Sequence, residues 1–441
     1  MSLVLDPLSI PDDHMAYGHS PSVRSESPLD DASTHLRVLP LEQLLADDRL
    51  VARWCDLLGR SDNAYAVLHP HQVAHEWRFW AGKPHDSRWQ PQVLILKSGD
   101  EWQGLAVLLP KPLSVQRLTH LPFPGTLTGW HLVGGQILLA RGRTPQAEDP
   151  SGRCRRMFAA MRNHIRQSGG AFLQIEDLDV DAPLYGAVQS QSGPEFQVVV
   201  PYEYRSRWRI ELTGGAAAYW SKFSSKTRNG FKRKQKKCGS RLLECITDPR
   251  DVPRFLEVAS EISKHTWQSH ELGLRIRNDE RDLALYTAQA EAGMFRSYLW
   301  SLDGRPVAFL VGNQAGETFH YEEVGFHEDF GDYSPGLLLL IDVLDDMLLV
   351  NTPRWFDFGG GDAEYKRIFG TEESRSGTTW VVPRGGVSSA LFRTACVMNG
   401  IRRQGARLRD VHARWKREQA LKLRKADTAD GKPPTPDQNP S

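Results

Sequence analysis

Five consecutive positions in the segment FDFGGGDAEYKRIFG, residues 356–370, bring together an acid, a phenol and an amine. These are Asp362, Tyr365 and Lys366, whose spacing of three and four residues places them on one side of a helical turn. The three glycines before them let a ligand approach the backbone closely. Such a group can transfer protons and hold an anion. The plainer interpretation is the start of a helix with an Asp–Lys ion pair.

The strand ETFHYEEVGF, residues 317–326, supplies further carboxylates. Strand alternation puts His320 and Glu322 on one face and Tyr321 and Glu323 on the other. Either glutamate is a candidate general base, and the alternative is an ordinary solvated carboxylate. His320 alone carries no comparable signal.

The segment DYSPGLLLL, residues 332–340, has the pattern of a helix start that binds phosphate. Ser334 suits the N-cap, Pro335 suits the first turn, and Gly336 leaves room beside the backbone of Leu337. The unpaired N–H groups and the positive end of the helix dipole would face the anion. The alternative is a turn with no ligand.

The run KFSSKTRNGFKRKQKK, residues 222–237, contains eight cationic residues and no acidic one. Like charges four residues apart destabilise a helix, and Lys226, Arg228, Lys232 and Arg233 all belong to such pairs. A polyanion would offset the repulsion, so these four are candidates for binding the anionic part of a substrate. The alternative is a basic helix that only promotes solubility.

Two long mixed segments, residues 36–202 and 203–384, are expected to position these groups. In each segment a hairpin, a strand, a helix and another strand follow in the same order. KSGDEWQGLAVLL corresponds in pattern to LDGRPVAFLVG, and AFLQIEDLD to RWFDFGGGD. The second segment opens with the strand SRWRIEL and one helix over 215–237. We interpret the repeated order as a structural duplication.

The composition excludes several classes of protein. The 441 residues suffice for about two to four domains. Lys and Arg total 55 against 54 Asp and Glu, so the net charge of +1 requires any basic site to be local. Five scattered cysteines without a CxxC pair favour neither a disulfide framework nor a metal site. Without a secretory signal or an apolar run of ~20 residues, we expect a cytoplasmic protein. Residues 1–35 and 426–441 are polar and are expected to be disordered tails.

Four motifs taken together carry a family resemblance: FSSKTRNGFKRKQKKCGSRLLECIT, LDGRPVAFLVG, YSPGLLLL and FDFGGGDAEYKRIFG. In this order they resemble the GNAT-superfamily acetyltransferases of the CelD-like type, found with bacterial cellulose and exopolysaccharide genes. The resemblance covers about residues 203–384. The arrangement is also similar to the Fem-type transferases, which have two GNAT-like halves. One departure is the phosphate-binding helix start around Ser334, Pro335, Gly336 and Leu337, called the cradle below. In the family it usually carries spaced glycines, and here only Gly336 remains.

The resemblance implies an α/β (α+β) fold with tandem GNAT-like domains, each a mixed, mostly antiparallel sheet flanked by helices. Residues 203–384 would be the catalytic domain, and 36–202 a GNAT-like domain without activity of its own. The sheet would splay between ETFHYEEVGF and RWFDFGG, with pantetheine in the gap and the pyrophosphate at Ser334, Gly336 and Leu337.

The implied reaction moves an acyl group from acyl-CoA, with acetyl-CoA as the expected donor and no metal, to an amine. A small molecule or a saccharide would carry that amine, in polysaccharide or cell-envelope biosynthesis. Glu322 or Asp362 would accept the proton, and Tyr365 or Lys366 would serve the leaving thiolate. Two alternatives stay open: a Fem-type transferase that uses aminoacyl-tRNA, and a non-catalytic GNAT-like scaffold.

The segment 385–425 is predicted to be a basic C-terminal helix. From Arg393 to Lys425 it holds eleven cations and two acids, a net charge of +9. It would either dock on the second domain through an apolar face or tether the protein to RNA or to the anionic surface of the inner membrane. The residues expected to dock are Leu391, Phe392, Val397 and Ile401.

Overall fold

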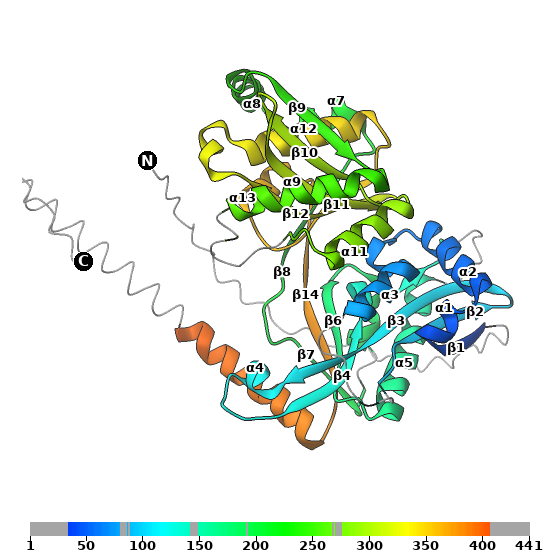
Figure 1. Cartoon of the computed structure of the whole chain (residues 1–441). Helices are drawn as coiled ribbons and strands as arrows, with labels where there is room; N and C mark the ends of the chain where they lie inside the picture. The colour runs from blue at the N-terminus through cyan, green and yellow to red at the C-terminus, as the bar shows by residue number, and fades with distance from the viewer. Residues whose placement is uncertain are drawn as a thin grey trace, which may run out of the picture.

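The computed structural model describes residues 34–405 except 80–85, 87–88, 142–148, 191–192, 267–268 and 270–275. The predicted tails therefore lie outside the described residues, apart from residues 34 and 35, and so does the stretch 406–425. Within the described part, 14 strands form one continuous sheet with helices on both faces (Figure 1). This mixed α/β architecture confirms the predicted fold class.

The N-terminal half, residues 34–199, begins with an edge strand that the sequence analysis missed. This strand, β1, pairs with the first strand of the predicted hairpin. In chain order the half contains β1 (Thr34–Pro40), α1 (Leu41–Leu45), α2 (Asp48–Gly59), η1 (Ala66–Leu68), α3 (Pro70–Phe79), β2 (Gln92–Ser98), β3 (Glu101–Ser114), α4 (Val115–Thr119), β4 (Thr126–Leu132), η2 (Val133–Gly135), β5 (Leu138–Leu139), α5 (Pro150–Ser168), β6 (Leu173–Asp179), α6 (Pro183–Ser190) and β7 (Phe196–Val199).

The C-terminal half, residues 205–383, repeats this order after one extra strand and two helices. Its elements are β8 (Arg205–Glu211), α7 (Gly215–Ser221), α8 (Ser225–Lys237), β9 (Arg241–Ile246), η3 (Pro249–Asp251), α9 (Val252–Lys264), α11 (Glu280–Glu291), β10 (Ser297–Leu302), β11 (Arg305–Ala315), β12 (Thr318–Phe326), η4 (Glu328–Tyr333), α12 (Pro335–Leu349), β13 (Trp355–Gly360), α13 (Glu364–Phe369) and β14 (Glu372–Pro383).

The strand pairing shows the duplication directly. In the N-terminal half β1, β2, β3 and β4 are antiparallel neighbours, and β4 then lies parallel to β6. In the C-terminal half β9, β10, β11 and β12 repeat this antiparallel order, and β12 lies parallel to β13. The halves join where β14 pairs with both β6 and β8. One sheet therefore runs through both predicted domains.

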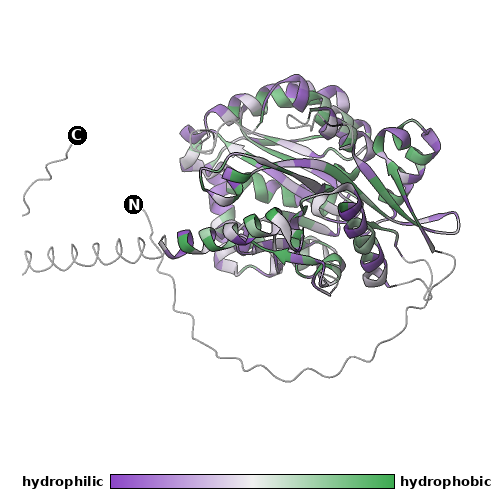
Figure 2. Ribbon diagram, turned by 90° about the horizontal axis from the view of Figure 1, so that it is seen from below, coloured by the Kyte–Doolittle hydropathy of each residue, from purple (hydrophilic) through white to green (hydrophobic). Residues whose placement is uncertain are grey.

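Hydrophobic residues run along the strands of the sheet and along the helices that cover it (Figure 2), and they form cores on both faces. In the C-terminal half, one core lies under α7 and α12 and includes Phe356 and Leu338. The opposite face of the same strands packs against α9 and α11. The N-terminal half has the same two-sided arrangement, with α2 on one face and α5 on the other. The strands of each half are thus packed against helices on both faces.

Local sequence signals account for one hairpin turn but not for the length of one helix. Asp303 and Gly304 link β10 to β11 with positive φ angles of 49° and 77°, as the predicted tight hairpin requires. The single helix predicted over 215–237 is wrong, because the chain breaks after α7. Ser224 starts α8 as a new helix by accepting a hydrogen bond from the Thr227 N–H at 3.2 Å.

The chain ends, in its described part, with a helix over residues 386–405. Phe392 and Ala395 are buried against Phe172 and Trp380, beside β7 and β14. The prediction that Val397 and Ile401 dock is wrong, since they are 61% and 57% exposed on the outer face. The helix docks where the halves meet, not on the second domain alone. Among the described helices, none has the length and apolar character to cross a bilayer.

Candidate active site

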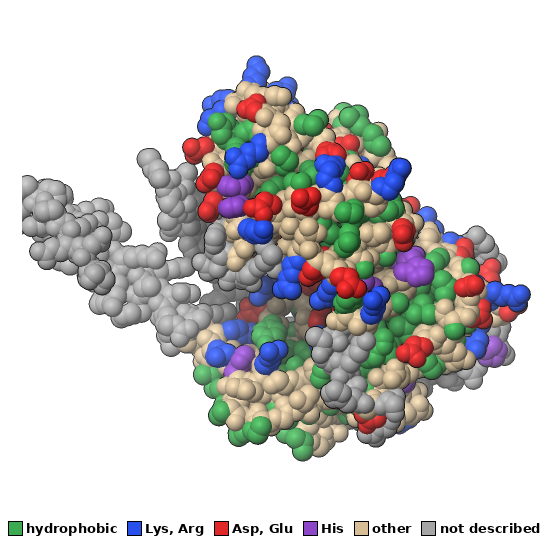
Figure 3. Space-filling view, in the orientation of Figure 1, with side chains coloured by type: hydrophobic (Ala, Val, Ile, Leu, Met, Phe, Trp, Pro, Cys, Tyr) green, Lys and Arg blue, Asp and Glu red, His purple; other side chains and the backbone are tan. Residues whose placement is uncertain are grey.

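A cavity of about 1070 Å³ lies between the two halves, and Figure 3 shows the molecule hollowed there. The C-terminal half lines it with β12, β13 and the loop at 359–363. The N-terminal half contributes residues of η1, α3, η2 and β6. Neither half encloses this space alone, so the site depends on how the halves dock.

The cavity occupies a splay in the sheet. β12 and β13 pair over only three residues each, ending at His320 and Asp357, and then separate. On its other side β12 has a bulge, because Tyr321 and Glu323 pair with consecutive residues of β11 and Glu322 is left over. The predicted alternation of these side chains is therefore wrong, and all three line the cavity.

Glu322, at the bulge, has the electrostatics of a general base. The Asn313 Nδ2 donates a hydrogen bond to its Oε1 at 2.5 Å. Burial raises the pKa of Glu322 to about 7, although the Asn313 hydrogen bond opposes the rise, and the charge of Glu323 adds to it. A carboxylate that titrates near neutral pH can take a proton from an ammonium group and release it again.

Asp362 also lines the cavity but is exposed and already paired. The Arg367 Nε donates to its Oδ1 at 2.7 Å, and this hydrogen bond lowers the pKa of Asp362. A carboxylate held in its charged form by a neighbouring guanidinium is a weak proton acceptor. The geometry therefore favours Glu322 between the two carboxylates.

Tyr365 extends from α13 toward β12 and lines the cavity. Its ring lies 6.4 Å from that of Tyr321, centroid to centroid, and the two hydroxyls share a hydrogen bond. Burial raises the pKa of Tyr365. A neutral phenol of this kind can donate its proton to a developing thiolate.

Lys366 is buried, and its ammonium group forms hydrogen bonds with backbone carbonyls. Its Nζ donates to the carbonyl oxygens of Phe358, at 2.8 Å, and Gly360, at 3.2 Å. These bonds fix a second bulge, in which Phe358 and Gly359 lie opposite a single residue of β8. Burial lowers the pKa of Lys366. The amine thus shapes the cavity wall.

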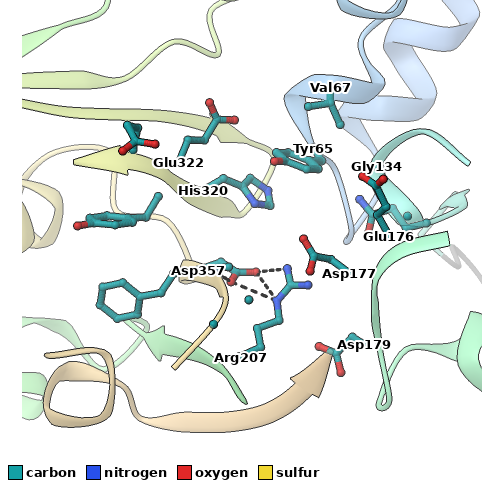
Figure 4. A pocket seen from close by; sticks show the side chains of 18 of the residues that line it. Tyr65, Val67, Gly134, Glu176, Asp177, Asp179, Arg207, His320, Glu322 and Asp357 are labelled. Atoms are coloured by element: carbon teal, nitrogen blue, oxygen red, sulfur yellow. Dashed lines mark hydrogen bonds and ion pairs between the residues drawn. The ribbon is translucent and has the colours of Figure 1, made fainter. Parts of the chain in front are cut away.

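Asp357 and Arg207 form an ion pair on the cavity wall that the sequence analysis missed (Figure 4). The Arg207 Nε donates to both carboxylate oxygens, at 3.1 and 3.2 Å, and the Gly359 N–H donates to Oδ1 at 2.8 Å. Burial alone would raise the pKa of Asp357, but Arg207 holds it below its usual value. The sequence signal that could have identified Asp357 is its place between two apolar phenylalanines in the strand RWFDFGG, where a charged residue needs a partner.

Tyr65, from the N-terminal half, stacks on His320 with ring centroids 4.1 Å apart. Burial lowers the pKa of His320 to about 4, so the imidazole is neutral. Burial raises the pKa of Tyr65, and the negative charges of Glu322 and Asp357 raise it further. No local pattern in the sequence identifies this pair, because the two rings are 255 positions apart.

The predicted phosphate cradle lies outside the cavity lining, at the far end of β12. Ser334 adopts a left-handed conformation, φ 56° and ψ 51°, and its carbonyl accepts from the Leu337 N–H at 3.1 Å. Gly336 approaches Phe326, so that a Cβ on the glycine would lie 3.3 Å from the ring. From Glu322 to Phe326 the strand spans about 13 Å.

The basic helix α8 flanks this cradle. The Lys234 Nζ donates to the Ser334 Oγ at 2.8 Å, and the Lys237 Nζ donates to the Asp332 carbonyl at 3.1 Å. Arg228 is half-buried and donates to the Trp220 carbonyl at 3.2 Å. Exposed on the same helix are Lys226, Lys232 and Arg233. Within the described ranges, no acidic side chain forms an ion pair with any cation of α8.

The central part of the C-terminal half matches a family model. Residues 225–367 match the family model of the acetyltransferase (GNAT) domain. The matched segment holds β9 to β13, with the splay, Glu322, Tyr365 and the cradle. Within the described residues no three His, Cys, Asp or Glu side chains gather as a metal site would require.

Similar structures extend the comparison to both halves. The crystal structure of FemX is similar with a TM-score of 0.56 at 13% identity, over 78% of this chain and 97% of that one. A tandem GNAT protein from the clavulanic acid biosynthesis pathway aligns with a TM-score of 0.39 at 13% identity, over 80% of this chain and 100% of that one. At these identities the FemX likeness shows the fold alone.

Among curated proteins, the chain is similar to a 23S rRNA (uracil(1939)-C(5))-methyltransferase of Vibrio vulnificus. The two are 23% identical over 293 residues, which is 60% of this chain and 62% of that protein. The chain thus spans about three fifths of the length of the curated relative that it matches. An identity this low assigns no family.

Proposed function

We propose that the protein is an N-acyltransferase that moves an acyl group from acyl-CoA, in the simplest case acetyl-CoA, to an amine. The observation that carries the proposal is the position of Glu322, a base that titrates near pH 7, at the splay of a segment that matches the GNAT family model. The acceptor in polysaccharide or cell-envelope biosynthesis, and the CelD-like type, belong to the same proposal.

In the proposed reaction Glu322 takes a proton from the acceptor ammonium. The free amine attacks the thioester carbonyl carbon, and N–H groups of β12 on the side that β13 has left stabilise the oxyanion. As the C–S bond breaks, Tyr365 donates its proton to the thiolate sulfur. Holding both substrates in one gap supplies part of the acceleration through proximity.

The donor fits the residues of the splay and the cradle. At the start of α12 Pro335 has no N–H and the Leu337 N–H is bonded to the Ser334 carbonyl, so the Gly336 N–H and the Lys234 ammonium would be the donors to a diphosphate. A pantetheine arm would run along β12 from Gly336 toward Glu322. The four cations Lys226, Arg228, Lys232 and Arg233 lie on the adjacent helix and would contribute attraction for the nucleotide's phosphates.

We assign the chemistry to residues 203–384 and no activity to residues 36–202. In the N-terminal half the corresponding parallel pair stays closed. A Cβ on Gly135, just after β4, would lie 1.8 Å from the Glu176 carbonyl oxygen of β6. That contact leaves no gap between β4 and β6 for a pantetheine arm.

The test is thiol release from acetyl-CoA by the purified chain with a panel of primary amines and matched alcohols. The expected result is thiol release that requires the amine, with the acetyl mass appearing on it. Absence of both acetyl-CoA binding and amine-dependent thiol release would overturn the proposal.

A second candidate is a Fem-type transferase that uses aminoacyl-tRNA. It is favoured by the similarity to FemX across both halves and by the exposed cations of α8. Binding to a tRNA would weaken steeply with salt, because each neutralised phosphate releases counterions. Tight, salt-sensitive tRNA binding without acetyl-CoA binding would favour this candidate over the first. A chain that binds neither would be the non-catalytic scaffold.

A further inference from the structure

The cavity carries more negative charge than the described residues neutralise. Three carboxylates on its wall are each matched by one cation: Glu176 by Lys111, Asp357 by Arg207 and Asp362 by Arg367. Asp177 and Asp179, which also line it, form no ion pair with any described residue. Both act on the charge of Arg207, which is already bonded to Asp357. Asp177 also acts on Lys366, whose ammonium group is bonded to two backbone carbonyls. Two carboxylates therefore face the cavity without a cation of their own.

The backbone presents Asp177 to the cavity in a conformation that costs energy. Asp177 has a φ of 48° within β6, where two residues, Glu176 and Asp177, bulge opposite one residue of β14. Aspartate tolerates this left-handed region better than most residues. Gly360 of the other half makes room, since a Cβ there would lie 3.0 Å from the Asp177 Oδ1. Strain of this kind concentrates at functional sites.

Two buried amides that line the cavity from α3 and α11 also lack a hydrogen-bond donor. Gln72 and Gln289 line the cavity and are each 2% exposed, yet neither Oε1 accepts a hydrogen bond within the described part. The Gln72 Nε2 donates to the Leu285 carbonyl at 3.1 Å, which orients that amide. Buried oxygens without a donor are costly and call for a ligand that donates hydrogen bonds.

Asp179 is oriented by its own partners. The Ser374 Oγ donates to its Oδ2 at 2.9 Å, and the Asp181 N–H donates to its Oδ1 at 3.0 Å. Tyr65 lies within the electrostatic reach of both Glu322 and Asp177. Figure 4 shows its ring between Glu322 on one side and Glu176 and Asp177 on the other. Glu322 and the two carboxylates Asp177 and Asp179 therefore face one continuous cavity.

We propose that the acceptor is a dication, with one amine that Glu322 deprotonates for acylation and a second protonated nitrogen that Asp177 and Asp179 hold. This inference rests on the proposed N-acyltransferase function and specifies its substrate class. The catalytic half supplies the base, and the N-terminal half supplies the second charge site. A half without chemistry of its own thereby selects the acceptor.

The experiment compares cadaverine with n-pentylamine, the same carbon chain with one amine fewer, in acetyl transfer by the full chain. A charge-assisted contact predicts a kcat/KM about 10- to 100-fold higher for cadaverine, mainly through a lower KM. Asp177→Asn and Asp179→Asn should remove most of this advantage, lowering kcat/KM for cadaverine far more than for pentylamine. Asparagine also tolerates the left-handed backbone, so the variant at 177 keeps the fold.

Asp181→Asn is the matched control, because Asp181 is exposed, is not part of the cavity wall, and only its backbone supports Asp179. Calorimetric titration of cadaverine without acetyl-CoA separates the two proposals. If cadaverine binds and the variants abolish binding, but no amine releases thiol, the site stands and the N-acyltransferase function fails. If pentylamine and cadaverine are acylated equally, or the preference survives both variants, the function stands and the dication site is wrong.

Discussion

At the scale of single residues, the site depends on how burial changes proton affinities. Replacing Glu322 by Gln keeps its size and removes the base. We expect kcat to fall by about 10²–10⁴-fold, the usual contribution of a general base, while acetyl-CoA affinity changes little. Steady-state kinetics and calorimetric titration measure the two effects. An equal loss in binding and turnover would make Glu322 a structural support.

The raised pKa of Glu322 also predicts opposite effects of pH on activity and stability. Activity should rise as pH passes through about 7, because the base must lose its proton. The free energy of unfolding should fall as the pH rises from 4.5 to about 7. Between the ordinary value of 4.5 and about 7 the folded chain binds a proton that the unfolded chain does not. Glu322→Gln should therefore melt at a higher temperature than the wild type above pH 7 and at a similar temperature below pH 4.5. A flat pH profile of kcat/KM would contradict this assignment.

Tyr365 and Asp362 provide a matched pair of variants on the same turn. Tyr365→Phe removes the hydroxyl that would protonate the thiolate, so kcat should fall with little change in KM. Asp362→Asn should retain most activity, because Arg367 already holds that carboxylate in its charged form. Steady-state kinetics with acetyl-CoA separate the two. A large loss in Asp362→Asn with normal Tyr365→Phe would reverse the assignment of roles.

At the scale of elements, hydrophobic periodicity and turn residues predicted most helices and strands, but not the bulges. The hairpin at Asp303-Gly304 follows from local patterns. Bulges at Glu322 in β12, at Phe358 and Gly359 in β13, and in β6 are set by pairing with distant strands. Each turns a side chain or a carbonyl toward the cavity. The sequence identified the segments that contribute to the site. The orientation of their side chains could not be predicted, because it depends on how the strands pair in the sheet.

The start of α12 gives a test of the cradle. Gly336→Val should weaken acetyl-CoA binding by about tenfold or more, because branched methyl groups would crowd Phe326 and the space for the diphosphate. Calorimetric titration measures the affinity, with the melting temperature as a check on folding. Gly331→Val is the control, since no atom lies within 4 Å of a Cβ there. Unchanged affinity in a folded Gly336→Val would remove the cradle from the donor site.

At the scale of the whole molecule, the two halves meet through contacts that join distant parts of the chain. The α3 helix binds α11 through Gln72 and through His75, whose Nε2 lies 2.9 Å from the Arg281 carbonyl oxygen. Tyr65 stacks on His320, and β14 ties β6 to β8. The duplication was readable from the repeated order of elements. The composite cavity was not, because its lining depends on which surfaces of the halves face each other.

The C-terminal helix allows the tether to be tested separately from the fold. Truncation after Val387 would remove Phe392, which is fully buried with its ring 5.1 Å from that of Trp380. Losing a buried phenylalanine costs about 3–5 kcal/mol, so this truncation should destabilise the chain. Truncation after Gly405 keeps the docked turns and removes residues 406–441, which carry nine cations and five acids, a net charge of +4, of which the stretch 406–425 alone carries +6. We expect it to keep acetyl transfer and the melting temperature but to lose binding to anionic vesicles at low salt, each cation near the surface contributing ~1 kcal/mol. Vesicle co-sedimentation measures the binding, with neutral lipid as the control. Equal binding by the full and shortened chains would show that this segment is not a tether.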